Sequence, residues 1–103
     1  MYTLKISPMV YDDLAAIKAY ITNDLMNPEA ALDLIRFITN AIRTLPDFPH
    51  KGTPLSSLLS IKIEYRFIIC KNYLVFYRVE QSSIFVLRVL YKRRNYLSLL
   101  FKD

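Results

Sequence analysis

The segment that decides the fold is EYRFIICKNYLVFYRVEQSSIFVLRVLYKRRNY, residues 64–96. Two runs rich in Tyr, Phe, Ile, Val and Leu, at 65–70 and 73–79, are separated only by Lys71-Asn72. Asn tolerates the positive φ of a two-residue turn, so this pattern predicts a β-hairpin. After a polar break, residues 84–91 form a third run of strong strand formers. We therefore expect three antiparallel strands that deliver a basic cluster, at 92–94, to the rim of a sheet.

The chain before this segment has the pattern of one short strand and two capped helices. Residues 2–7 are compatible with a strand. Ser7-Pro8 and Asn27-Pro28 each combine a good N-cap residue with proline at the first helical position. Apolar residues follow at helical spacing, and Pro46 ends the second helix. The two apolar stripes are Val10, Leu14, Ile17, Ile21 and Leu25, then Ala31, Leu34, Ile35, Ile38, Ile42 and Leu45.

These elements predict an α+β fold in the order β-α-α-β-β-β, as a single domain over residues 1–103. An antiparallel helix hairpin should pack on one face of a small, mostly antiparallel, four-stranded sheet, with a long loop at 47–60. If the last turn is at Gln81-Ser82, one face carries Tyr73, Val75, Tyr77, Ile84, Val86 and Arg88. The other face then carries Leu74, Phe76, Arg78, Phe85, Leu87 and Val89. Alternation alone leaves open which face the helices cover.

Composition limits the classes of protein to which the chain can belong. With 53% hydrophobic residues and one Gly, it has ample material for a core. No apolar run is long enough to span a membrane, and the N-terminus lacks the pattern of a secretion signal. The only cysteine, Cys70, is flanked by apolar residues and is typical of a small core residue. We therefore expect a cytoplasmic protein without a membrane association.

The net charge of +5 is distributed unevenly along the chain. Residues 1–60 hold five Lys or Arg and six Asp or Glu, whereas residues 61–103 hold nine basic and three acidic residues. The positive field therefore belongs to the predicted sheet and the C-terminal segment. Such a field attracts nucleic acid or an acidic protein. The alternative is a solvated basic surface that keeps the protein soluble.

Familiar catalytic patterns are absent from the sequence. There is no Gly-rich phosphate loop and no pair of Cys or His for a metal, so we expect neither a cofactor nor a metal. His50 is interpreted as an exposed loop residue, and Asp12 and Asp13 as residues that favour a helix N-terminus. What remains is a set of cationic and phenolic side chains that could hold a phosphate backbone. The set comprises Arg66, Arg78, Arg88, Tyr91, Lys92, Arg93, Arg94 and Tyr96.

The element order, the phrase KNYLVFYRV at 71–79 and the closing VLRVLYKRRNY at 86–96 resemble the RelE/ParE superfamily of bacterial toxins. These proteins are the toxins of type II toxin–antitoxin modules and are also called plasmid stabilisation proteins. The resemblance covers nearly the whole chain, including both capped helices and the LPDFP break at 45–49. It implies a growth-inhibiting protein that an acidic antitoxin neutralises. Promoter DNA would be bound only through that antitoxin.

The resemblance implies one of two targets, the ribosome with its mRNA or DNA gyrase. In the RNA-cleaving branch the substrate 2′-hydroxyl is the nucleophile, and Arg66, Arg93, Arg94 and Tyr96 match positions at which basic and tyrosine residues are kept. Glu64 and Tyr96 are the nearest candidates for a general base. The candidates for contact with RNA or another target are then Arg78, Arg88, Tyr91 and Lys92.

Two departures favour the gyrase-directed branch, whose members are not themselves enzymes. Leu74 occupies a position where many RNA-cleaving relatives carry Arg, and the C-terminal His of others is missing.

A third hypothesis is a non-toxic protein-interaction module. In every case we expect the uncovered sheet face and residues 96–101 to expose apolar surface that a partner protein covers.

Overall fold

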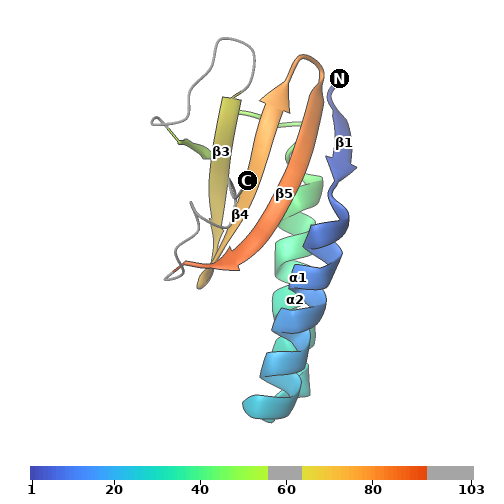
Figure 1. The fold of residues 1–103 in the computed structure, drawn as a ribbon, viewed down its shortest axis with the longest axis vertical. Coiled ribbons are helices and arrows are strands. Elements are labelled where there is room, and N and C mark those ends of the chain that lie inside the picture. Colours follow the sequence, from blue (N-terminus) through green and yellow to red (C-terminus); the bar gives the residue numbers. More distant parts are fainter. Residues whose placement is uncertain (56–63, 93–103) are drawn as a thin grey trace.

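A computed structural model of the chain describes residues 1–55 and 64–92 (Figure 1). Its elements, in chain order, are β1 (Thr3–Ile6), α1 (Pro8–Ala19), the π-helical turn η1 (Tyr20–Asp24), α2 (Pro28–Arg43), β2 (Thr53–Pro54), β3 (Glu64–Cys70), β4 (Tyr73–Glu80) and β5 (Ser83–Tyr91). The α+β class and the hairpin of two helices on one sheet are confirmed. Within the described ranges, no helix is long and apolar enough to cross a membrane.

Both predicted helix starts are confirmed. The Ser7 side chain accepts a hydrogen bond from the Met9 N–H at 3.2 Å, and the Asn27 side chain accepts one from the Ala30 N–H at 3.1 Å. Each bond satisfies an N–H group that has no partner inside the helix. The first helix ends differently from the sequence pattern, because its last turn widens into η1. Met26 then takes a φ of 52°, which reverses the chain into α2.

The sheet has five strands in the order β1-β5-β4-β3-β2, with β1 parallel to β5 and the other pairs antiparallel. Both predicted turns are present. In the first, the positive φ of 59° lies at Lys71 and not at Asn72, the residue expected to adopt it, and in the second Gln81 has a φ of 53°. The expected count of four strands was one too few. The additional strand, β2, is two residues long and contains a proline, which is tolerated at a sheet edge. It has no run of strand-forming residues from which it could be predicted.

A β-bulge in β5 changes the predicted distribution of side chains between the two faces. The register between β4 and β5 shifts between Phe76 and Tyr77, so β5 has one extra residue there. Beyond this shift, Val89 lies opposite Val75 and belongs to the core under the helices. The prediction that Val89 shares a face with Leu74 and Phe76 was therefore wrong, because strict alternation does not survive a bulge.

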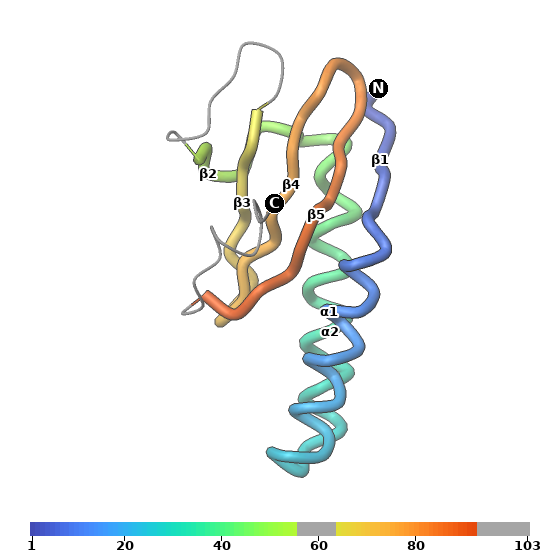
Figure 2. The backbone as a smooth tube through the Cα atoms, viewed as in Figure 1, coloured from blue at the N-terminus to red at the C-terminus, as the bar shows by residue number. Residues whose placement is uncertain are grey.

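The main core lies between the helix hairpin and the sheet (Figure 2). Its buried members include Ile38 from α2, Tyr77 from β4 and Ile84 from β5. The opposite face of the sheet is less open than expected. Leu74, Phe76 and Leu90 are only 7%, 1% and 2% exposed and form a second cluster with Leu55, Tyr65 and Phe67. The expectation of a bare apolar face was therefore wrong for this part of the sheet, in part because Leu55 packs onto it.

Candidate functional site

Arg88, predicted to contact a target, is held inside the protein by Asp13 of α1. Its Nε and Nη2 donate hydrogen bonds to the two Asp13 carboxylate oxygens, each at 2.8 Å. The Val89 N–H donates a third bond to the same carboxylate at 2.9 Å. The Arg88 and Asp13 side chains are 14% and 11% exposed. The hydrogen bond with Asp13 raises the pKa of Arg88, so this guanidinium is charged and paired.

Arg66 is also bound within the protein, on β3, which β4 separates from β5. Its Nε and Nη2 donate to the Glu64 carboxylate at 2.8 and 3.1 Å. Its Nη1 donates to the carbonyl oxygens of His50 and Gly52. Through these four hydrogen bonds Arg66 links the segment before β2 to β3. It has little hydrogen-bonding capacity left for a phosphate.

The buried hydroxyl of Tyr77 supports the same segment. It donates to the Pro49 carbonyl at 2.8 Å and accepts from the Gly52 N–H at 3.0 Å. A Cβ at position 52 would lie 2.6 Å from this hydroxyl oxygen, which explains why the one glycine is found here. Hydrogen bonds with Arg66 and Tyr77 therefore hold this loop against the sheet.

His50 and Glu64 form a side-chain contact that the sequence did not indicate. His50 Nε2 lies 3.2 Å from Glu64 Oε2, although the His50 side chain is 55% exposed. The hydrogen bond from Arg66 lowers the pKa of Glu64 despite partial burial. A carboxylate with a lowered pKa is a weak proton acceptor. This arrangement argues against Glu64, one of the two general-base candidates, as an effective base.

Arg78 lies on the face away from the helices and is therefore separate from Arg66 and Arg88. Its guanidinium carbon is 4.4 Å from the centroid of the Phe85 ring, and its Nε is 3.5 Å from Glu80 Oε2. The structure therefore does not gather the three strand arginines into one site.

Tyr91 and Lys92 lie where β5 ends beside the turn between β3 and β4. The Lys92 N–H donates to the Asn72 carbonyl at 2.9 Å. The Tyr91 ring packs edge-on against Tyr73, with ring centroids 5.6 Å apart. The three remaining predicted residues, Arg93, Arg94 and Tyr96, lie outside the described residues.

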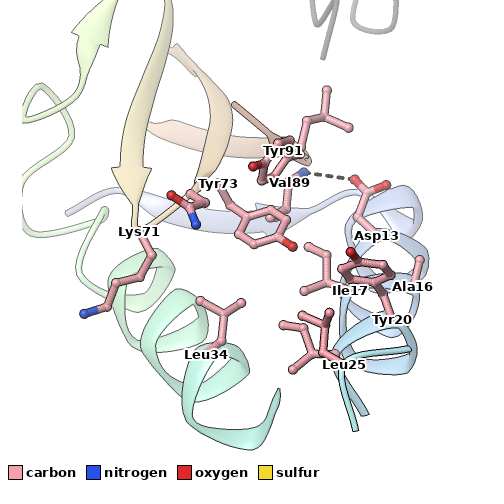
Figure 3. Close-up of a pocket in the computed structure, with 13 residues that line it drawn as sticks. Asp13, Ala16, Ile17, Tyr20, Leu25, Leu34, Lys71, Tyr73, Val89 and Tyr91 are labelled. Carbon is pink, nitrogen blue, oxygen red and sulfur yellow. Dashed lines mark hydrogen bonds between the residues drawn. The ribbon is translucent and has the colours of Figure 1, made fainter. Parts of the chain in front are cut away.

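A groove that the sequence did not predict lies beside Tyr91, between the end of the first helix and the ends of β4 and β5 (Figure 3). It has a volume of about 600 Å³. Its lining includes Asp13, Ile17, Tyr20, Leu34, Tyr73 and Tyr91. Burial raises the pKa of Tyr73, with smaller contributions from the Tyr91 and Tyr20 phenols. Three phenols from distant parts of the chain therefore meet at one groove.

Among residues 1–55 and 64–92, no three His, Cys, Asp or Glu side chains come together as metal ligands do. Cys70 is buried, and burial raises the pKa of its thiol, which makes it a poor nucleophile.

Two solved structures define the class of protein to which this fold belongs. The chromosomal ParDE TA system from P. aeruginosa matches with a TM-score of 0.72 and 24% identity, over 88% of this chain and 96% of that one. The archaeal RelE-RelB complex from Pyrococcus horikoshii OT3 matches with a TM-score of 0.62 and 19% identity, over 90% of this chain and 97% of that one. The fold is therefore that of the RelE/ParE-like proteins. Comparison with curated proteins gave no match.

The family follows from the sequence itself. The model of the ParE toxin of the type II toxin–antitoxin system parDE matches residues 4–96. The chain therefore belongs to the ParE toxin family of type II toxin–antitoxin systems, and the resemblance to the RelE/ParE superfamily is confirmed.

Asp13→Asn is expected to lower the free energy of unfolding by about 2 to 4 kcal/mol, because it leaves a largely buried guanidinium without its counter-charge. Arg88→Met should cost a similar amount, because it leaves the carboxylate unpaired. The double variant should recover part of the loss, since neither charge then remains buried alone. Urea denaturation of the unchanged protein, the two single variants and the double variant measures this coupling. Asp12→Asn, at an exposed neighbouring position, is the control. Strictly additive losses would contradict the pairing.

The lowered pKa of Glu64 gives an expected dependence of stability on pH. A carboxyl group whose pKa is lower in the folded than in the unfolded protein stabilises the fold above its unfolded pKa. This contribution is lost as the pH falls through the lower pKa that the carboxyl group has in the folded protein. Glu64→Gln should therefore lose stability near neutral pH and show a shallower decrease as the pH falls below the ordinary glutamate pKa of about 4.3. Urea denaturation across that range checks it, and parallel curves for the two proteins would contradict it.

Proposed function

We propose that this chain is the toxin of a type II toxin–antitoxin module, and that it arrests growth by binding DNA gyrase. Membership of the ParE family supports the toxin role. The observation that favours a binding mechanism over RNA cleavage is the internal pairing of Arg66 and Arg88 with Glu64 and Asp13. An arginine fork that already holds a carboxylate is not available to stabilise a scissile phosphate.

Leu74 adds independent support for a ParE-like activity. This residue replaces the arginine of many RNA-cleaving relatives, and its side chain is 7% exposed among Phe76 and Leu90. An apolar position of this kind offers no ligand to a phosphate group. The RNA-cleaving alternative would therefore depend on Arg93, Arg94 and Tyr96.

We further propose that the chain acts in the cytoplasm and that an acidic antitoxin neutralises it. The two structural neighbours are described as a ParDE toxin–antitoxin system and a RelE-RelB complex. The excess of basic residues in 61–103 provides the charge that an acidic partner would complement. Contact with promoter DNA would be made by the antitoxin and not by this chain.

Induced expression of the chain alone is expected to stop growth, and the purified chain is expected to inhibit supercoiling by gyrase. Messenger RNA ends on ribosomes should remain unchanged, because the mechanism is binding. Position-specific cuts in mRNA with normal supercoiling would overturn the gyrase assignment in favour of ribosome-dependent RNA cleavage. Normal growth with abundant soluble protein would overturn the toxin role and leave a non-toxic interaction module.

Changing both Arg93 and Arg94 to Ala is expected to reduce toxicity at equal expression. The two cations follow Lys92 in the most basic run of the chain, so they are the strongest remaining candidates for target contact. A control is Lys51→Ala, which removes a positive charge outside this run. Growth after induction measures the difference. Undiminished toxicity of the double variant would exclude these two residues from the target contact.

A further inference from the structure

The groove beside Tyr91 has the features of a site for a positively charged side chain. Tyr20 is 50% exposed and Tyr91 37% exposed, so both rings are accessible from solvent. Tyr73 lies between them, with its ring against Tyr91 and its hydroxyl directed into the groove (Figure 3). Several aromatic rings around one space bind ammonium and guanidinium groups, because each ring presents a negative face to the cation.

No unpaired positive charge of the described residues occupies this space. Arg88 is neutralised by the two-point contact with Asp13 at the wall of the groove. Lys71 also belongs to the lining, but its ammonium nitrogen lies 4.7 Å from the centroid of the Phe37 ring, directed away from the tyrosines (Figure 3). A cation that enters between the phenols therefore meets no like charge in direct contact.

The end of the helix hairpin beside the groove carries an excess of acidic residues, of which Asp33 lines the adjoining depression together with Lys71. Between Lys18 and Arg36 the sequence contains three carboxylates, Asp24, Glu29 and Asp33, and no basic residue. The first helix also ends here, and the partial negative charge of a helix C-terminus favours a cation. This end of the helix hairpin is therefore complementary in charge to a basic partner, in contrast to the sheet.

An apolar depression continues the groove along the hairpin. It has a volume of about 540 Å³ and shares Ile21, Leu25 and Leu34 with the tyrosine groove. Phe37, which is 44% exposed, lies at its far side. A bound segment would thus meet aromatic rings first and an aliphatic surface beside them.

We infer that this groove binds a basic segment of a partner protein, with an arginine side chain among Tyr20, Tyr73 and Tyr91 and an adjacent apolar side chain over Leu25 and Leu34. The groove adjoins the end of β5, where Lys92 follows Tyr91, but the inference concerns the tyrosine side chains and not that basic run. It does not depend on gyrase being the target, and it can be tested on the purified chain without a toxicity assay.

The test uses a short capped peptide that carries one arginine between leucine residues, and a matched peptide with citrulline, which is neutral and nearly isosteric, in place of arginine. Calorimetric titration into the full-length chain should show binding of the arginine peptide and weaker binding of the citrulline peptide. Raising the salt concentration should reduce the difference between them. In NMR spectra the arginine peptide should shift the ring signals of Tyr20, Tyr73 and Tyr91.

Tyr20→Leu and Tyr91→Leu should each weaken arginine-peptide binding about twofold to fivefold, as expected for loss of one partly exposed cation–π contact. Tyr91→Phe, which keeps the ring, should retain most of the affinity. Tyr11→Leu is the matched control, because Tyr11 is 60% exposed on α1 and does not line the groove. Asp33→Asn, at an exposed site that leaves the core intact, should also weaken binding and reduce its salt dependence.

Three outcomes would overturn the inference. Equal affinity for the arginine and citrulline peptides would show that charge is not recognised. An effect of Tyr11→Leu equal to that of Tyr20→Leu would show that the groove is not the site. A dimer in sedimentation experiments that Tyr20→Leu dissociates would assign the groove to a second copy of the chain.

Discussion

The carboxylate of Asp13 joins the helical layer of this protein to its sheet. It accepts hydrogen bonds from two nitrogens of the Arg88 side chain and from the Val89 N–H, 75 and 76 residues further along the chain. The main-chain bond ties the contact to one position on β5, and the two side-chain bonds fix the direction of the guanidinium. Because the pair is largely buried, any arrangement that separated its members would leave an uncompensated charge. The position of α1 on β5 follows from this requirement.

The same internal pairing changes how the net charge should be understood. Counted from the sequence, residues 61–103 carry a large positive excess. Two of those charges, on Arg66 and Arg88, face Glu64 and Asp13 at hydrogen-bonding distance and contribute little to the field outside the protein. The sheet is therefore less cationic than its composition indicates. The proposal of a binding mechanism rests on this small number of unpaired strand arginines.

The sequence predicted what depends on neighbouring residues and missed what depends on distant ones. The helix starts at Ser7 and Asn27 and the positions of the two turns were predictable, because they depend on only a few consecutive residues. The positive φ of the first turn was expected at Asn72 and lies at Lys71. The role of Asp13 was missed because Asp12 and Asp13 were assigned to the helix N-terminus, whereas no acidic residue lies in the first turn of α1. The contact of His50 with Glu64 and the meeting of the three tyrosines likewise join residues that only the tertiary structure brings together. The predicted roles of Arg93, Arg94 and Tyr96 remain predictions.

The β-bulge connects these features, because it decides what the groove contains. Ile84 and Val86 face the helices, so strict alternation along β5 would place Tyr91 on the opposite face, together with Phe85 and Leu87. The extra residue reverses the alternation: Val89 joins the helix-side core, Leu90 joins the opposite cluster, and Tyr91 comes to lie against Tyr73 at the groove. Arg88 would face the helices together with Ile84 and Val86 under strict alternation as well, so the bulge is not needed for its contact with Asp13. What this local irregularity provides is the aromatic wall of the groove, which is consistent with the frequent occurrence of bulges next to functional sites.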